Sequence, residues 1–348
     1  MKGTVIALGA VNGREAAALI EDGRLADLLI DSDRPRPGTI YRARADRPVK
    51  GQGGMFLQTP DGPAFLRQVK GLAPGQPLLV QVTGHAEPGK AMPVTSKLLF
   101  KSRYAIVTPA APGLNVSRQI REDDLRDRLL EIAHDAMGGE AMGLILRSSC
   151  ATAAPEDIAQ DIRAMAGLAR AVTDDATGAP EKLTEGDGPH ALAWRDWPAD
   201  ANLEDGPDAF ESMGVLDALE DLGSPLAPLP GGGSMAIEPT RALVAVDINT
   251  GADTSPAAGH KANLAAAREL PRQLRLRGLG GQITLDLAPM AKKDRRAFET
   301  ALRAAFRRDA TETALVGWTP LGHYELQRKR DRMPLAEILA DSIETAHT

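Results

Sequence analysis

Two aspartates stand at the ends of short apolar runs, where carboxylates can support metal chemistry. Asp247 lies near the end of the run Ala242–Asn249, and Asp286 closes the run Gln282–Asp286. Both runs are rich in aliphatic residues and bounded by turn residues, which predicts two buried strands. A buried carboxylate needs a shared proton, a cationic partner or a metal ion. A metal ion held by both aspartates is the economical solution.

The segment between the two runs predicts a helix over residues 261–277. At about 100° per residue its leucines fall on one side, and its basic residues form a stripe on another. The stripe consists of Lys261, Arg268, Arg272 and Arg275. Strand, helix, strand is the order of a βαβ unit, in which ligands bind outside the carboxyl ends of the strands. The plainer alternative is that both aspartates cap turns and the arginines form a solvated face.

Four sequence blocks carry a resemblance to a known family. They are Leu-Pro-Gly-Gly-Gly-Ser at 229–234, Val-Asp-Ile-Asn-Thr-Gly at 246–251, the basic segment 263–277 and Gly-Gly-Gln-Ile-Thr-Leu-Asp at 280–286. In this order they resemble the catalytic core of the ribonuclease E/G family of endoribonucleases. The resemblance implies that Asp247 and Asp286 hold a magnesium ion and that Asn249 orients them. It gives the task of positioning RNA to three arginines of the predicted helix, Arg268, Arg272 and Arg275.

The resemblance also implies a fold of several α/β subdomains. An OB-type β-barrel is inserted in a reduced ribonuclease-H-like subdomain, and a 5′-sensor region and a DNase-I-like α/β catalytic subdomain follow. The predicted boundaries are 1–37 with 185–228 for the ribonuclease-H-like part, 38–106 for the barrel, 107–184 for the sensor and 229–348 for the catalytic part.

The first hundred residues have the turn-rich pattern of small β structures. Residues 15–30 predict a hairpin about Asp22-Gly23, and residues 31–38 predict a linker. From residue 39 to 106, short strands alternate with Gly/Pro turns, as in a small barrel. The resemblance makes Phe56 and Phe65 stacking platforms for RNA bases and Lys90 a basic contact, and stacking contributes roughly 1–3 kcal/mol per base. The alternative is that both rings belong to the barrel core.

Residues 107–178 shift toward helix, with apolar periodicity over 121–137 and 154–172. The segments 112–120 and 142–148 resemble the family's sensor for RNA 5′ ends. This resemblance implies that Arg147 and Ser148 bind the 5′-monophosphate of the RNA and that the backbone of Ile106 contributes to this binding. A guanidinium fork beside a hydroxyl donor suits a terminal phosphate. The alternative is an ordinary surface arginine at a strand end.

Most of the remaining segments show local patterns of strand, helix and loop. Residues 179–228 are acidic and rich in Gly and Pro, with one strand predicted around Trp194–Trp197, one helix over 209–222 and little core. Residues 291–308 predict an amphipathic helix whose inward face is formed by Phe298, Leu302 and Phe306. A strand over 313–318 and a helix around 324–330 resemble the end of the family's catalytic subdomain.

Composition limits the classes of protein and partner. The 348 residues are 43% hydrophobic and carry a formal charge of -6, which indicates a globular protein. The charge is unevenly distributed, because residues 261–332 hold 16 Lys/Arg against eight Asp/Glu. The negative net charge therefore does not exclude a nucleic acid as partner. The single cysteine, Cys150, excludes internal disulfides, CxxC zinc sites and the family's zinc-linked tetramer. We expect a cytoplasmic protein, no membrane partner, and either a monomer or a dimer.

The leading hypothesis is a magnesium-dependent endoribonuclease that cuts single-stranded RNA in RNA processing or decay and prefers 5′-monophosphorylated ends. The first alternative is a non-catalytic RNA-binding relative. It is favoured by departures from the family pattern at Arg241, Pro271 and Pro289. The second alternative, a metal-dependent phosphoesterase for small substrates, explains the carboxylates but not the barrel. Retention of the two aspartates and Asn249 favours the enzyme.

Overall fold

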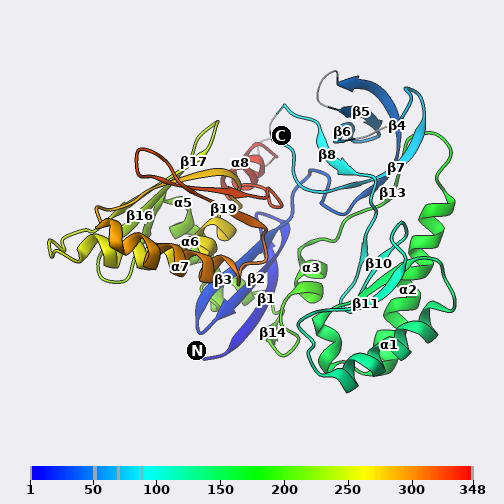
Figure 1. The fold of residues 1–348 in the computed structure, drawn as a ribbon, viewed down its shortest axis with the longest axis horizontal. Coiled ribbons are helices and arrows are strands. Elements are labelled where there is room, and N and C mark those ends of the chain that lie inside the picture. The colour runs from blue at the N-terminus through cyan, green and yellow to red at the C-terminus, as the bar shows by residue number, and fades with distance from the viewer. Residues whose placement is uncertain (1, 50–52, 69–70, 88, 346–348) are drawn as a thin grey trace. The chain divides into compact units, whose positions relative to one another are not determined.

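The computed structural model describes residues 2–49, 53–68, 71–87 and 89–345. The chain divides into two compact units, one made of Met1–Asp31 with Ala201–Thr348 and the other of Ser32–Asp200. Figure 1 shows the course of the chain through both units by colour.

The first unit begins with a small four-stranded sheet of order β14-β1-β2-β3. Its strands are β1 (Thr4–Val11), β2 (Arg14–Glu21), β3 (Arg24–Ile30) and β14 (Asn202–Glu204). The predicted hairpin is confirmed, because β2 and β3 pair about Asp22 and Gly23, whose φ angles of 50° and 78° suit a tight turn. In β14 the chain returns to pair in parallel with β1.

Two short helices pack on this small sheet, where one was predicted. They are α4 (Ala209–Ser212) and α5 (Val215–Gly223), and they are separated at Gly214, which has φ 69°. Phe210, Val215 and Leu219 are buried in one cluster with residues of β1, β2 and β3. The expectation of little core in this acidic segment is therefore wrong, since its few apolar residues are spaced to cover one sheet face.

A six-stranded sheet of order β15-β16-β17-β18-β20-β19 forms the rest of the first unit. Its strands are β15 (Leu226–Pro228), β16 (Ser234–Pro239), β17 (Val244–Asn249), β18 (Gly281–Asp286), β19 (Thr313–Trp318) and β20 (Tyr324–Arg328). The helices are α6 (Ala258–Leu276), a 3-10 turn (Lys292–Asp294), α7 (Arg295–Phe306) and α8 (Leu335–Thr345). The parallel pair β17–β18 joined by α6 confirms the predicted βαβ unit.

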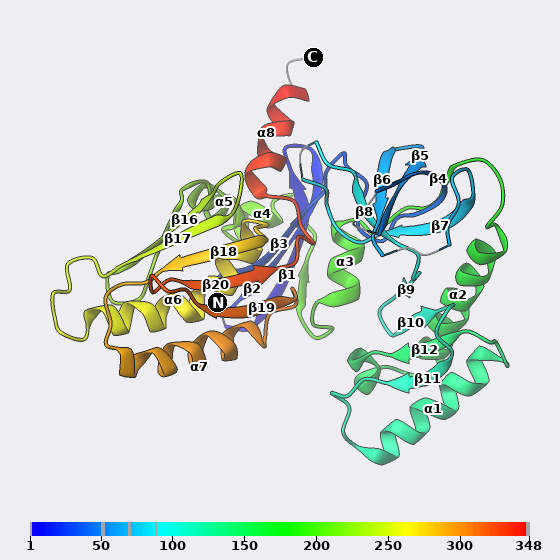
Figure 2. The ribbon, with the colours of Figure 1, turned by 45° about the horizontal axis from the view of Figure 1, so that its top comes forward.

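Only one face of the six-stranded sheet is covered by α6 and α7, which lie on the same side of it in Figure 2. Along β17 burial alternates, with Val246 and Ile248 buried and Asp247 and Asn249 exposed. Both predicted strands form, but they are buried on one face only, because both helices cover that face. The helix predicted around residues 324–330 is wrong: β20 alternates buried Tyr324 with half-buried and exposed neighbours, which is the period of a strand.

The second unit contains a closed five-stranded barrel, as expected of an OB-type domain. Its strands are β4 (Ile40–Val49), β5 (Gly54–Thr59), β6 (Gly62–Leu66), β7 (Pro77–Val82) and β8 (Met92–Thr95). They run in the order β4-β5-β6-β8-β7, and pairing of β4 with β7 closes the barrel. Strand β13 (Glu181–Thr184) adds to β4 from outside. Tyr41, Met55, Leu57 and Val80 are among the side chains that fill the core.

A second sheet follows, of order β11-β12-β10-β9. It contains β9 (Phe100–Lys101), β10 (Ala105–Thr108), β11 (Gly113–Val116) and β12 (Gly143–Leu146). Its helices are α1 (Asp123–Met137), α2 (Pro155–Asp174) and a 3-10 helix (Ser148–Thr152), and α1 and α2 share a buried cluster with its strands. Strands β9 and β10 thus belong to this sheet, although the predicted barrel range extended to residue 106.

The segment before β14 differs from prediction in two ways. Residues 189–196 form helix α3 (Pro189–Asp196), and not a strand around Trp194. Proline at the helix start and burial of Pro189 and Ala193 on one side favour the helix. Residues 185–200 also belong to the second unit, whereas the predicted subdomain grouped them with residues 1–37.

Candidate active site and RNA-contact residues

The two predicted metal ligands are brought side by side by the parallel pair β17–β18. Asp247 is the direct partner of Asp286 in the strand register. Neighbouring strands lie about 4.8 Å apart, so the two side chains leave the same sheet face within reach of one ion. Both residues are exposed, on the face opposite α6 and α7. Burial therefore does not require a metal ion at this site, but the geometry leaves two neighbouring carboxylates accessible to a ligand.

Asn249 makes the contact that an orienting residue needs. Its Nδ2 donates to Asp247 Oδ2 over 2.8 Å, two residues along the same exposed face. Glycines let the preceding loop pass close to this strand end: a Cβ on Gly233 would meet the Asn249 carbonyl oxygen at 2.6 Å, and one on Gly251 the Gly232 oxygen at 2.1 Å. The Leu-Pro-Gly-Gly-Gly-Ser block and the Asp-Ile-Asn-Thr-Gly block are thus two sides of one tight packing contact.

Two further residues support Asp286, and the sequence argument gave neither of them a role. Asn263 on α6 is fully buried and holds the chain just after β18, with Nδ2 donating to Ala288 O over 2.8 Å and Ala288 N donating to Oδ1 over 3.0 Å. His323 Nε2 lies 3.7 Å from Asp286 Oδ1. Asn263 is the first residue of the family-like block 263–277, whereas no sequence pattern indicated a role for His323.

This donor set fits magnesium. Mg²⁺ usually binds one or two carboxylates and keeps several waters, unlike zinc, which takes four nitrogen, sulfur or oxygen ligands. Among the residues that the structure describes, no three His, Cys, Asp or Glu side chains gather as a metal-binding group. Of the departures from the family pattern, Pro289 lies in the loop fixed by Asn263, and Arg241 precedes β17 at the strand end away from Asp247.

The three arginines of α6 have different environments. Arg268 is exposed. Arg272 donates from Nε to Leu25 O over 2.6 Å and from Nη1 to Glu269 Oε1 over 2.6 Å. Arg275 donates from Nη2 to Ala26 O over 2.8 Å and pairs through Nη1 with Asp309 Oδ1 at 2.5 Å. Two of the predicted RNA contacts, Arg272 and Arg275, therefore join α6 to β3. Helix α6 continues through Pro271 to Leu276.

A buried carboxylate strengthens the same junction. Asp27 on β3 accepts from both guanidinium nitrogens of Arg332, and the Nη2 bond is 2.9 Å long. Burial alone would raise the pKa of Asp27, but Arg332 and Arg275 outweigh it and lower the pKa below its ordinary value. The charged carboxylate is thus a structural part of the first unit.

The barrel presents its two predicted aromatic residues on the outside. Phe56 and Phe65 are direct partners on β5 and β6, with ring centroids 5.2 Å apart. Neither ring belongs to the buried barrel cluster, so the alternative that both are core residues is wrong. Arg47 on β4 adds a guanidinium 5.1 Å from the Phe56 centroid. Lys90 is exposed and pairs with Glu87 Oε2 at 2.5 Å.

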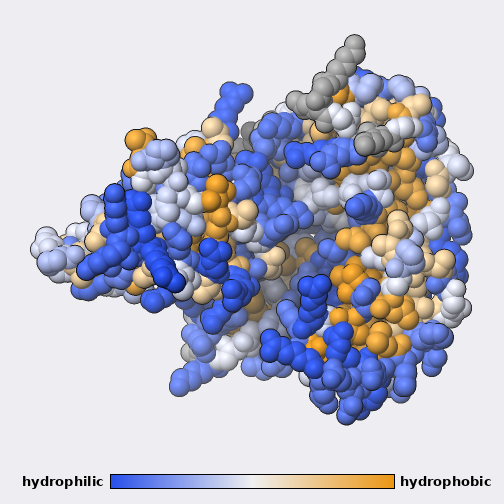
Figure 3. Space-filling model, viewed as in Figure 1, coloured by the Kyte–Doolittle hydropathy of each residue, from blue (hydrophilic) through white to orange (hydrophobic). Residues whose placement is uncertain are grey.

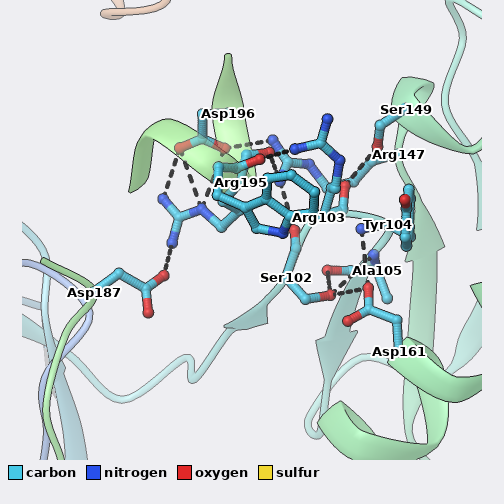
Figure 4. A network of polar contacts seen from close by, with 11 residues as sticks. Ser102, Arg103, Tyr104, Ala105, Arg147, Ser149, Asp161, Asp187, Arg195 and Asp196 are labelled. Atoms are coloured by element: carbon cyan, nitrogen blue, oxygen red, sulfur yellow. Dashed lines mark hydrogen bonds and ion pairs between the residues drawn. The ribbon is translucent and has the colours of Figure 1, made fainter. Parts of the chain in front are cut away.

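The predicted 5′-phosphate residues lie in the second unit, and Arg147 belongs to the polar network drawn in Figure 4. Arg147 Nη1 donates to Ser102 O over 2.5 Å and to Arg195 O over 3.2 Å, and Nη2 pairs with Asp196 Oδ1 at 2.6 Å. Ser148 is exposed beside it. Burial would raise the pKa of Asp196, but the two arginines, Arg195 and Arg147, outweigh burial and lower the pKa. Arg147 is therefore partly neutralised within the chain.

Ile106 lies in β10, on the open face of the sheet whose strand β12 ends just before Arg147. It pairs with Ile145, which is 37% exposed, while α1 and α2 pack with the buried residues of the sheet. Figure 3 shows hydrophobic side chains gathered over β10 and β11. Ile145 was not predicted, and its exposure adds an apolar surface beside the position given to the 5′ end.

Across the described part of the chain, no helix combines the length and the apolar character that a membrane crossing requires.

Comparison with known proteins places these residues in a family. The family model described as Ribonuclease E/G family matches residues 100–202 and 199–331. Ribonuclease G of Salmonella typhimurium (strain SL1344) is 29% identical over 402 residues, covering 95% of this chain and 80% of that protein. Ribonuclease G of Escherichia coli (strain K12) is 27% identical over 401 residues, covering 95% and 80%.

A longer relative is Ribonuclease E of Nostoc sp. (strain PCC 7120), which is 26% identical over 386 residues. The alignment covers 94% of this chain but 56% of that protein, so the chain spans little more than half of it. The family model spans both the Arg147 network and the β17–β18 carboxylate pair. The chain belongs to the ribonuclease E/G family.

Proposed function

We propose that this chain is a magnesium-dependent endoribonuclease that cleaves single-stranded RNA in the cytoplasm, in RNA processing or decay. The observation that carries the proposal is the pairing of Asp247 with Asp286 on the open sheet face, with Asn249 bonded to Asp247. The ribonuclease names of the relatives support the reaction class. In this family frame, the β14-β1-β2-β3 sheet is the reduced ribonuclease-H-like part and the six-stranded sheet is the DNase-I-like part.

The chain's own residues hold and orient the reacting groups. A magnesium ion bound here would stabilise the charge that develops on the scissile phosphate. Asp247 and Asp286 would hold the cation, Asn249 fixes the rotamer of Asp247, and the buried Asn263 fixes the loop after β18. Because this sheet face is open, an RNA backbone can approach both carboxylates.

RNA contacts are proposed for the side chains whose surfaces remain available. Phe56 and Phe65 offer stacking surface outside the barrel core, and Arg47 places a cation beside Phe56. Arg268 is the exposed member of the α6 stripe, and Lys90 is exposed on the barrel. Arg272 and Arg275 position α6, which packs on the sheet face opposite the two aspartates.

A preference for 5′-monophosphorylated ends is proposed for the Arg147 network. The exposed Ser148 hydroxyl and the remaining N–H groups of Arg147 would bind the terminal phosphate, and the Ile106 backbone would help. A 5′-hydroxyl end would leave these donors without a charged acceptor and would bind less well.

A second candidate is a non-catalytic RNA-binding protein. One observation favours it: within the described chain the paired aspartates have no third carboxylate or histidine grouped with them as metal ligands, and proline stands at 289 where the family pattern has aspartate. Two ligands bind an ion more weakly than three, which would reduce cleavage before it reduced RNA binding.

The test uses the purified chain and a 5′-labelled single-stranded RNA with and without magnesium. The proposal expects internal cleavage with magnesium, no cleavage in a chelator, and fragments bearing 5′-phosphate and 3′-hydroxyl ends. RNA that is bound but left intact at every magnesium concentration would establish the second candidate and reject the nuclease.

A further inference from the structure

Trp194, at the end of α3, has an unusual exposure for a tryptophan. Its residue surface is 67% exposed. Tryptophan carries the largest aromatic surface of any side chain, and most of it is usually covered in a folded protein. A single exposed apolar residue alone needs no explanation. This one differs because its ring is held in place from one side.

Arg103 forms the support beneath the indole. Arg103 is 7% exposed, and its Cζ lies 4.2 Å from the Trp194 ring centroid. The same guanidinium donates through Nη1 to the Trp194 carbonyl oxygen, and Ser149 Oγ donates to Arg103 O over 2.5 Å. Since one face of the ring lies on Arg103, the exposed area belongs mainly to the opposite face and the edge.

The helix that carries Trp194 is also fixed. Arg195 pairs with Asp187 Oδ2 at 2.5 Å and with Asp196 Oδ2 at 2.8 Å, and Arg147 bonds to Arg195 O and to Asp196. The indole is therefore a preorganised surface. Stacking on it costs little conformational entropy, because the ring is already ordered before a partner arrives.

Two contacts connect this ring with the proposed phosphate site. Arg147 donates to the carbonyl of Arg195, the residue after Trp194, and the support Arg103 is bonded to Ser149, the residue after Ser148. Arg147 thus contacts the residue next to Trp194, and Ser148 is next to the residue that contacts Arg103. In a nucleotide one ribose separates the 5′-phosphate from the base, so a platform for the first base has to lie close to Arg147 and Ser148.

We propose that Trp194 is the stacking platform for the 5′-terminal nucleobase of the RNA, a subsite that rests on the phosphate role proposed for Arg147 and Ser148. Its ligand class is a nucleobase attached to a 5′-monophosphate. Every base has a π-face, so the platform accepts all four bases. It adds affinity for ends whose first base is unstacked and does not select a sequence.

The test measures equilibrium binding without divalent cations, so that no RNA is cleaved. The probe is a ten-nucleotide single-stranded RNA with a 5′-monophosphate and a 3′-fluorophore, read by anisotropy. Trp194→Ala should weaken binding roughly 5- to 100-fold, and Trp194→Phe should weaken it less because a smaller ring remains. Leu168→Ala, at a residue 40% exposed on α2 in the same unit, is the matched control and should bind like the wild type.

Abasic probes locate the base. An RNA lacking its first base should bind the wild type as weakly as the intact RNA binds Trp194→Ala, and that variant should no longer distinguish the two probes. An RNA lacking its sixth base should retain the effect of Trp194→Ala. Quenching of indole fluorescence by the intact RNA should be reduced in Trp194→Phe.

Failure of this inference is distinguishable from failure of the proposed function. If the wild type prefers 5′-monophosphate and cleaves RNA while Trp194→Ala binds unchanged, the platform is rejected and the nuclease stands. Equal loss of affinity from the first-base and sixth-base abasic probes also rejects it. If the wild type binds none of these RNAs, both proposals fall together.

Discussion

The carboxylate face of β17–β18 and the arginine network around Arg147 are opposite kinds of polar site. On the first, Asp286 has a side chain 70% exposed, and Asp247 accepts from Asn249 while facing solvent. In the second, Arg147 already bonds to two carbonyl oxygens and a carboxylate. An open carboxylate pair leaves its lone pairs to a ligand, whereas an arginine with three of its donors already bonded first has a structural role. Residue type alone therefore predicts the first site better than the second.

The largest effect should come from the open site. Asp247→Asn and Asp286→Asn each keep the shape of the side chain and remove a charge that a cation needs, so cleavage should fall by about 100-fold or more. RNA affinity should stay within a few-fold, because other residues position the strand. Initial cleavage rates at saturating magnesium measure the first quantity, and anisotropy measures the second.

A control on the same sheet face isolates the effect. Glu238 on β16 is exposed and pairs with Ala245, two residues before Asp247. Glu238→Gln removes an equal charge without touching the pair and should leave the rate within about twofold. Comparable losses in all three variants would mean that general surface charge, and not a shared ion, explains the result.

The sequence was most informative where local pattern and chemistry agreed. The two strands, the helix between them and the positions of Asp247 and Asp286 followed from apolar runs at βαβ spacing, and the structure pairs these residues directly. The Asp22-Gly23 hairpin and the inward face of α7 followed in the same way, with Phe298 and Leu302 fully buried. These elements are specified by near neighbours, so a one-dimensional pattern suffices.

The sequence was least informative where tertiary contacts decide. Trp194 has the aromatic character of a strand residue, but α3 forms because Pro189 starts it and Arg103 and Arg147 hold its end. The basic stripe of α6 could not reveal which arginines meet β3, since their partners lie nearly 250 residues away in the chain. His323 reaches Asp286 through a hairpin whose register no local pattern gives.

The arginines of α6 sharpen the comparison within one helix. Arg272→Ala removes donors from Glu269 and from Leu25 O, in a site where Glu269 is buried, so unfolding should require about 3 kcal/mol less. Arg268→Ala, at the exposed position, should change stability by less than about 0.5 kcal/mol and weaken RNA binding a few-fold. Denaturant melts and salt-dependent anisotropy check both. Equal destabilisation by the two variants would remove the distinction between arginines bonded within the chain and exposed arginines.

The 5′ end tests whether an arginine that is partly bonded within the chain also binds a ligand. Arg147→Ala should slow cleavage of 5′-monophosphorylated RNA about tenfold, because charge-assisted bonds to the phosphate are lost. The same variant should cut 5′-hydroxyl RNA at nearly the wild-type rate. Matched substrates that differ only in the terminal phosphate give the comparison. If both rates fall alike, the role of Arg147 is confined to holding Ser102 and α3.

The smallest effect concerns the carboxylate that shares Arg147 with the incoming phosphate. Asp196→Asn keeps an oxygen acceptor for Arg147 but removes a negative charge beside the phosphate site, so 5′-monophosphate RNA should bind about three- to fivefold more tightly at low salt. The pKa of Asp196 is lowered, so its carboxylate stays charged at the pH values where an ordinary aspartate titrates. It loses its charge only at lower pH. Acidifying the wild type from pH 8 to 5 should therefore not reproduce the gain. Anisotropy on 5′-monophosphate and 5′-hydroxyl RNA measures it, and a gain of equal size on both RNAs would show that Asp196 repels the RNA chain generally and does not compete for Arg147.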